Sequence, residues 1–255
     1  MAASTLLEID GVCRYFGGLR AVDDVSFAVA ENELVGVIGP NGAGKTTLFN
    51  VVSGALPPTR GAVRFEGRPL TGLKTSTIAR RGVARTFQNL RVFPDITVFD
   101  NVSVGAIGYY GHSLWRTLLP RPGRDDGDRI TELIWQILER TGLAEHAQEL
   151  AGNLPYGRRK YLEIARALAL RPKLLLLDEP AAGLNSTETV ELAQFIRALR
   201  DEGLTILLVE HDMGLVMGVS DRVVVLDSGR KIADAAPDAV RRDPAVLAAY
   251  LGSEA

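Results

Sequence analysis

The chain has 255 residues, of which 46% are hydrophobic, so it is long enough for one large α/β domain with a sizeable core. The charges nearly balance, with 29 Lys and Arg against 31 Asp and Glu, and no basic block marks a nucleic-acid surface. We therefore expect no nucleic-acid partner. The single cysteine excludes a disulfide framework within the chain. No apolar run approaches the ~20 residues that span a bilayer, which predicts a protein that is soluble by itself.

The first part of the chain predicts strands in quick succession. Residues 6–12 and 21–29 alternate apolar and polar side chains, with a glycine pair at 17–18 as the turn between them. Residues 62–65 predict another strand. Because these strands follow one another without intervening helices, we expect an antiparallel layer.

A glycine-rich turn joins a buried strand, residues 34–38, to a helix at 46–53. The turn fits the G-x-x-x-x-G-K-[ST] pattern, in which glycines point backbone N–H groups into one concavity and the lysine reaches the β- and γ-phosphates. The hydroxyl that follows the lysine can ligate Mg²⁺. A turn that only joined a strand to a helix would not need Lys-Thr-Thr. The candidate phosphate-binding residues are Gly39, Pro40, Asn41, Gly42, Ala43, Gly44, Lys45, Thr46 and Thr47.

The second half of the chain changes from a helical to an alternating pattern. Residues 118–128 predict an exposed loop, and 130–140 predict a helix with one apolar face. From residue 174 onward, the pattern predicts alternating strands and helices at 174–177, 187–200, 205–209, 213–219 and 223–226. This alternation is typical of a parallel sheet that is covered on both faces. The tail from residue 234 predicts a peripheral helical extension.

Acidic and imidazole side chains stand where two of these strands end. Ligands bind at the carboxyl ends of parallel strands, so these residues are candidates for chemistry. Asp178 can hold Mg²⁺ through water, and Glu179 can orient or deprotonate a water that attacks the γ-phosphate. His211 follows the next strand and could hydrogen-bond the γ-phosphate or that water. A solvated acidic loop and a structural histidine are the alternative interpretations.

In order and spacing, these motifs resemble those of ATP-binding subunits of ABC transporters, over essentially the whole chain. Residues 39–46 match Walker A, 154–158 the signature, and 174–178 Walker B. The resemblance implies catalytic roles for Glu179, His211 and the Q-loop glutamine Gln88, and Mg²⁺ contacts for Thr46, Gln88 and Asp178. It also implies that Tyr156 and Gly157 contact ATP, and that Phe16, or else Tyr15, stacks on adenine.

The resemblance implies the fold class as well. We expect a single ABC-type P-loop NTPase domain over 1–255, with a mainly parallel core sheet flanked by helices, an antiparallel β layer and a helical subdomain. Its expected parts are the β layer and P-loop part of the core at 1–88, the helical subdomain at 89–157, the signature helix and remaining core at 158–233, and a C-terminal helical extension at 234–255.

Within the family, the sequence resembles the branched-chain amino-acid importer group, in features such as Tyr156-Gly157 and Asn185. This resemblance implies an ATPase that energises uptake of branched-chain amino acids; urea, amides or aromatic acids are alternative solutes. It also implies a head-to-tail dimer with a second ATP-binding subunit, related or identical. The dimer would serve two membrane permeases, and through them a solute-binding protein, at the cytoplasmic face of the plasma membrane.

Two positions depart from the general pattern of the family. Pro155 replaces the signature serine, so one hydrogen bond to the γ-phosphate, worth about 1.5–3 kcal/mol, is missing. The loss could weaken ATP-driven closure unless the Gly157 amide and the cationic residues 158–160 compensate, and it leaves a weakly hydrolysing regulatory module as an alternative. Asn185 stands where most members have aspartate in the D-loop.

Overall fold

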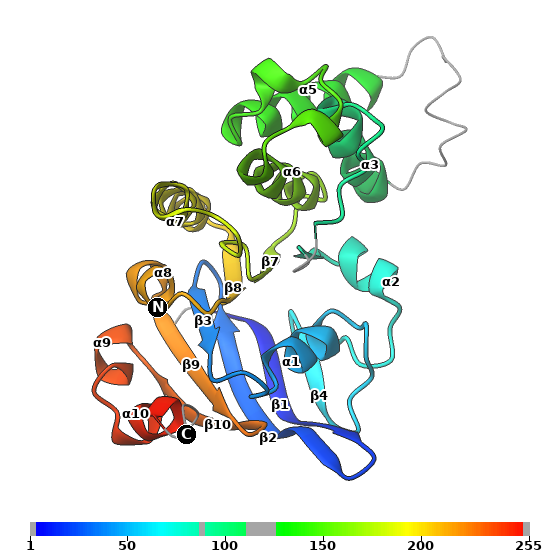
Figure 1. Ribbon diagram of the computed structural model, residues 1–255. Helices are drawn as coiled ribbons and strands as arrows, with labels where there is room; N and C mark the ends of the chain where they lie inside the picture. The colour runs from blue at the N-terminus through cyan, green and yellow to red at the C-terminus, as the bar shows by residue number, and fades with distance from the viewer. Residues whose placement is uncertain (1–3, 87–89, 111–125, 252–255) are drawn as a thin grey trace.

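The computed structural model describes residues 4–86, 90–110 and 126–251 (Figure 1). An antiparallel sheet with strand order β2-β1-β4-β5 lies beside a larger sheet. The antiparallel strands are β1 (Thr5–Phe16), β2 (Leu19–Ala30), β4 (Arg60–Phe65) and β5 (Arg68–Pro69). This sheet confirms the antiparallel layer that the closely spaced strands predicted.

The larger sheet has six strands in the order β10-β9-β3-β8-β7-β6, parallel except that β10 pairs antiparallel with β9. Its strands are β3 (Leu34–Ile38), β6 (Val83–Arg85), β7 (Leu174–Asp178), β8 (Thr205–Val209), β9 (Arg222–Asp227) and β10 (Arg230–Ala235). The sequence did not predict β10 and instead suggested helix from Asp234. The charged and only partly buried residues of β10 explain the miss, because they lack the apolar pattern of an inner strand.

Helices surround the sheets. Those near the core are α1 (Lys45–Val52), α2 (Thr75–Arg80), α7 (Ser186–Asp201), α8 (Met213–Val219), α9 (Pro237–Val240) and α10 (Pro244–Leu251). A helical group at the top of Figure 1 contains α3 (Val98–Tyr110), α5 (Asp126–Arg140) and α6 (Tyr156–Leu168), with 3₁₀ turns at Ala144–His146 and Ala151–Asn153. The predicted loop was wrong at its end, since α5 already begins at Asp126; the loop's residues 118–125 lie outside the described ranges.

Strand β7 shows how the core is divided between the two faces of the large sheet. Leu174 and Leu176 belong to a hydrophobic cluster with α1 and the antiparallel sheet. Leu175 and Leu177 belong to a second cluster with the helical group and α7. All four leucines are fully buried, which stabilises the fold by roughly 1.5–3 kcal/mol per side chain relative to exposure. Because both faces of β7 are buried, its sequence is a continuous apolar run and does not alternate with polar residues.

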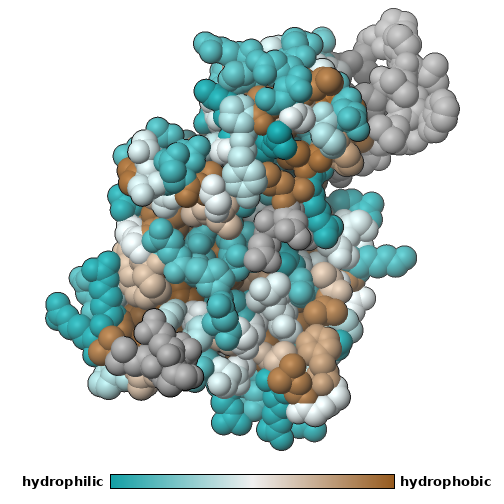
Figure 2. Space-filling model, viewed as in Figure 1, coloured by the Kyte–Doolittle hydropathy of each residue, from teal (hydrophilic) through white to brown (hydrophobic). Residues whose placement is uncertain are grey.

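Figure 2 shows hydrophilic residues over most of one face, with hydrophobic residues exposed in small groups. Within the described ranges, no helix combines the length and the apolar character needed to cross a membrane. The sequence analysis divides the domain into four parts, at 1–88, 89–157, 158–233 and 234–255. These limits stay a proposal.

Candidate nucleotide-binding and catalytic site

A cavity of about 650 Å³ opens at the carboxyl ends of the parallel strands, where β3, β7 and β8 deliver their loops. It brings together many of the predicted site residues from distant parts of the chain. Those that line it are Phe16, Asn41, Gly42, Ala43, Gly44, Lys45, Thr46, Thr47, Glu179 and His211. The sheet topology therefore assembles the predicted phosphate loop, catalytic carboxylate and histidine at one place.

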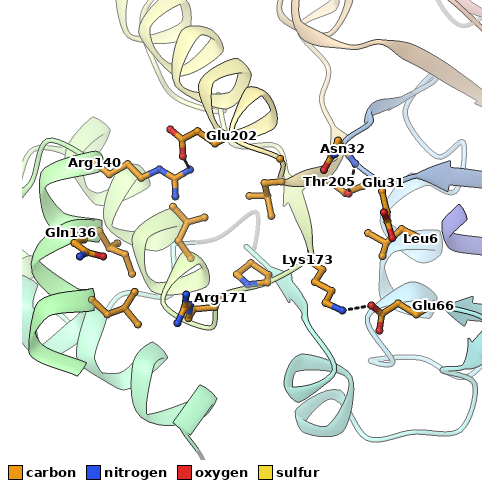
Figure 3. Close-up of a pocket in the computed structure, with 16 residues that line it drawn as sticks. Leu6, Glu31, Asn32, Glu66, Gln136, Arg140, Arg171, Lys173, Glu202 and Thr205 are labelled. Carbon is orange, nitrogen blue, oxygen red and sulfur yellow. Dashed lines mark hydrogen bonds and ion pairs between the residues drawn. The ribbon is translucent and has the colours of Figure 1, made fainter. Parts of the chain in front are cut away.

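A larger cavity, of about 720 Å³, lies at the other end of the sheet, between α5 and the core (Figure 3). Ion pairs join Arg140 to Glu202 and Lys173 to Glu66 along its walls. It faces the amino ends of β7 and β8, away from the edge where parallel sheets bind ligands. We therefore assign the chemistry to the smaller cavity.

Close backbone packing holds the glycine-rich loop in place. Gly39 has φ of 152° and Gly44 has φ of 100°, values that L side chains rarely adopt. A Cβ on Gly39 would collide with the carbonyl oxygen of Leu226, and one on Gly44 with that of Ala21. The loop is thus wedged between β2 and β9, and only glycine fits at these two positions.

Lys45 begins α1 and is 5% exposed. Its Nζ donates to the carbonyl oxygens of Gly39 at 2.7 Å and Pro40 at 3.0 Å. Burial lowers the pKa of Lys45, and the charge of Glu179 opposes that shift. The ammonium and the free N–H groups at the start of α1 give this end of the cavity a positive potential that suits phosphate.

Asp178 ends β7 and is held by Arg85, a residue to which the sequence analysis gave no role. Arg85 Nη2 lies 2.7 Å from Asp178 Oδ2, while its Nη1 donates to Asn50 on α1 and to Ser53 just after it, each at 2.8 Å. Asp178 Oδ1 is buried without a hydrogen-bond partner among the described residues. A buried carboxylate oxygen needs a partner, and a Mg²⁺-bound water would provide one. Together with the exposed Thr46 at the start of α1, this donor set fits Mg²⁺.

Glu179 and His211 meet at the mouth of the cavity. His211 Nε2 lies 2.7 Å from Glu179 Oε1. Glu179 is 7% exposed and has φ of 50°, a conformation that costs a non-glycine residue about 1–3 kcal/mol. Its backbone N–H donates to the Val209 carbonyl at 2.8 Å, which helps to hold the strained conformation. Such strain is concentrated at functional sites.

Comparison with known proteins shows the family. A family model described as ABC transporter matches residues 22–182. This chain belongs to the ABC transporter family. A second model, described as branched-chain amino acid ATP-binding cassette transporter, matches residues 230–255. The cassette is thus an ATP-binding ATPase subunit of an ABC transporter.

Individual relatives place the cassette in the branched-chain group. It is 47% identical to the high-affinity branched-chain amino acid transport ATP-binding protein LivG of Salmonella typhimurium, over 97% of this chain and 98% of LivG. It is 45% identical to BraF of Pseudomonas aeruginosa, over 97% and 98% of the two chains. It is also 36% identical to BraG of the same bacterium, over 97% and 100%. The crystal structure of the ADP conformation of the cassette MJ1267 matches with a TM-score of 0.86 and 32% identity, over 98% and 99% of the two chains.

The cassette contains a further buried acid, Glu210, which the sequence analysis did not single out. Its two carboxylate oxygens accept hydrogen bonds from the backbone N–H groups of Ala181 at 2.6 Å and His211 at 2.9 Å. Glu210 thereby ties the loop after β7 to the loop after β8. Burial raises the pKa of Glu210, although these hydrogen bonds act to lower it. The only signal in the sequence is its place at a strand end beside His211.

The signature residues lie outside the Walker A cavity. Pro155 precedes α6, and the adjacent Tyr156, 46% exposed, donates its hydroxyl to the Ala182 carbonyl at 3.2 Å. Gly157 is buried, and a Cβ there would lie 2.6 Å from Glu188 Oε1. One chain therefore does not bring Tyr156 and Gly157 to its own phosphate loop.

The cations of the first turn of α6 are bonded to backbone carbonyl oxygens. Arg158 donates to Gly142 at 3.0 Å, and Arg159 donates to Leu154 and Gly152 at 2.8 and 2.7 Å. Lys160, 2% exposed, donates to Glu179 at 3.3 Å. These hydrogen bonds to backbone carbonyl oxygens offset part of the conflict between the three cations and the helix dipole.

The structure separates the two candidate adenine-stacking residues. Phe16 lines the cavity and is 43% exposed, with the Arg14 guanidinium 4.6 Å from the centre of its ring. Tyr15 instead donates its hydroxyl to Asp23 at 2.7 Å, beside a different cavity. These contacts favour Phe16. Gln88 lies outside the described residues, so its predicted roles stay sequence-based.

Proposed function

We propose that this cassette hydrolyses MgATP with Glu179 as the general base or water-orienting residue, and that hydrolysis drives import of branched-chain amino acids. The observation that carries the catalytic part is the 2.7 Å contact between His211 and Glu179, at the mouth of the cavity that the Walker A loop lines. General-base catalysis of this kind contributes roughly 10²–10⁴-fold to a rate.

The other residues have roles that follow from their positions. Lys45 exchanges its bonds to the loop carbonyls for the β- and γ-phosphates, and the loop amides bind the remaining phosphate oxygens. Thr46 and Asp178 hold Mg²⁺, which when bound neutralises charge on the phosphates. His211 positions Glu179 or the attacking water. Gln88 is assigned a catalytic role and a Mg²⁺ contact from the sequence resemblance alone.

Transport of branched-chain amino acids is supported by the match at residues 230–255 and by the names of LivG and BraF. Urea, amides and aromatic acids are the alternative solutes. Uptake of labelled leucine, urea and phenylalanine into vesicles that carry the assembled transporter distinguishes them. Leucine uptake that depends on ATP and on Glu179 is the expected result, and uptake of only another solute would overturn the assignment.

We further propose a head-to-tail dimer, in which the signature of each subunit covers the ATP of the other. The separation of Tyr156 and Gly157 from the Walker A cavity supports this arrangement. Because BraF and BraG are related cassettes of one bacterium, a second, different ATPase subunit is the favoured partner. The dimer would sit on two permeases at the cytoplasmic face of the membrane, and only the permeases would contact the solute-binding protein.

Steady-state phosphate release by the assembled transporter tests the catalytic proposal. Glu179→Gln should lower turnover roughly 10²–10⁴-fold, to a small residual rate, while ATP still binds. Glu149→Gln is a matched control, since Glu149 makes the same 2.7 Å contact with a histidine, His146, away from the site. Wild type and Glu179→Gln could instead release phosphate equally slowly while both bind ATP. That result would favour the alternative function, a weakly hydrolysing regulatory module, which Pro155 in the signature suggests.

A further inference from the structure

We propose that Lys160 is a positioning residue for Glu179, and that it connects the signature helix to the catalytic carboxylate of the same chain. The proposal rests on the proposed catalytic role of Glu179. Lys160 lies one helical turn after Tyr156, on the same face of α6. Its ammonium therefore comes from the segment that, in the dimer, faces the nucleotide of the other subunit.

The burial of Lys160 is the first observation. The side chain is 2% exposed, although lysine is almost never fully buried unless it is paired. Its Nζ donates to the backbone carbonyl oxygen of Glu179 at 3.3 Å. The same oxygen accepts the backbone N–H of Ala182 at 3.2 Å, so Lys160 caps the turn that follows Walker B.

The strained backbone of Glu179 depends on its contact with Lys160. With φ of 50°, the residue keeps its conformation only because neighbours hold it. The Val209 carbonyl fixes its N–H, and Lys160 fixes its carbonyl oxygen. A misplacement of about 1 Å at a catalytic group can cost roughly a hundredfold in rate. Loss of the Lys160 bond should therefore lower turnover through the orientation of Glu179.

Tyr156 extends the connection to the signature. Lys160 Nζ lies 5.7 Å from the centre of the Tyr156 ring, and the Tyr156 hydroxyl donates to the Ala182 carbonyl at 3.2 Å. Tyr156 and Lys160 thus contact the two ends of the turn from Glu179 to Ala182. A nucleotide that displaces the signature in one site would move Glu179 in the other, which couples the two sites.

Two variants test the role of the ammonium in the assembled transporter. Lys160→Met keeps the length and the apolar stem but loses the donor, and should lower kcat about ten- to hundredfold with KM changed less than about twofold. Lys160→Arg restores a donor and should recover much of kcat. Lys173→Met is the matched control at the opposite end of β7, where Lys173 pairs with Glu66, and should keep the wild-type kcat. The Hill coefficient for ATP should fall toward one in Lys160→Met alone.

A double variant separates this proposal from that of the catalytic site. If Lys160 acts through Glu179, adding Lys160→Met to Glu179→Gln lowers the residual turnover no further. If Glu179→Gln keeps turnover, the proposed role of Glu179 itself is wrong. If Glu179→Gln is inactive but Lys160→Met keeps the kcat and Hill coefficient of wild type, only the positioning role is wrong. Equal losses in Lys160→Met and Lys160→Arg, with lowered melting temperatures in both, would also overturn it, because they mark a packing role.

Discussion

His211 Nε2 lies 2.7 Å from Glu179 Oε1, although 31 residues separate the two in the chain and they follow different strands. The pairing is possible because β7 and β8 are adjacent parallel strands, with Asp178 opposite Val209 in the register. The loops that follow them therefore start at the same level. This relationship gives Glu179 a defined orientation.

His211→Ala should lower kcat roughly ten- to a hundredfold, with a smaller effect on KM, because Glu179 loses the group that orients it. Phosphate release at saturating and at limiting ATP measures both constants. His146→Ala removes a histidine that makes an equally short contact with Glu149 on the surface, and should leave turnover unchanged. An unchanged kcat in His211→Ala would show that the pair is only structural.

Arg85→Met should lower the free energy of unfolding by about 3–5 kcal/mol, because it leaves the Asp178 carboxylate buried without its charge partner. The side chains of Arg85 and Asp178 are 7% and 3% exposed. Urea denaturation measures the loss. Adding Asp178→Asn to Arg85→Met should restore part of the stability, since no unpaired charge remains. Simple additivity of the two substitutions would contradict an energetic link between these residues.

Glu210→Gln should reveal a pH-dependent contribution of Glu210. Since its folded-state pKa is raised above the ordinary value of 4.5, the folded protein holds this proton more tightly than the unfolded chain. The stability of wild type relative to Glu210→Gln should therefore rise as the pH is lowered from 8 toward about 4.5. Urea denaturation of both proteins across this range gives the difference. A difference that shrinks on acidification would mean that the backbone hydrogen bonds outweigh burial.

Phe16→Ala should weaken ATP binding by about 1–3 kcal/mol, the typical value of base stacking on an aromatic ring. Tyr15→Phe removes only the hydroxyl bonded to Asp23, and should leave ATP affinity near that of wild type. Titration with a fluorescent ATP analogue compares the two. The opposite pattern would assign adenine stacking to Tyr15.

Pro155→Ser should strengthen ATP-driven association with the partner ATPase roughly ten- to a hundredfold, because a serine hydroxyl adds a hydrogen bond worth about 1.5–3 kcal/mol to a phosphate. The backbone at Pro155 is extended, which is the conformation of a helix N-cap, so serine fits there. Sedimentation with and without ATP measures the change. Equal association of both proteins would show that the cations and the Gly157 amide already replace that bond.

The sequence predicts the residues of this site whose roles are local, and it misses those whose roles are set by distant contacts. The Walker A spacing and the strand ends at Asp178 and His211 follow from short patterns. Arg85 and Glu210 gain their roles only when separate strands become neighbours, so no motif marks Arg85, and only the place of Glu210 at a strand end hints at a role. The sequence shows Lys160 only as one of the cationic residues 158–160, because it does not show that the Glu179 carbonyl oxygen lies beside it.

Asn185 caps α7: its side chain accepts the Glu188 N–H at 3.0 Å, and the Glu188 side chain accepts the Asn185 N–H at 2.9 Å. Asparagine and aspartate are about equally good at an N-cap. An exchange between the two at this position therefore has little effect on the start of the helix. Where lineages keep one of them, selection acts on something other than the start of α7.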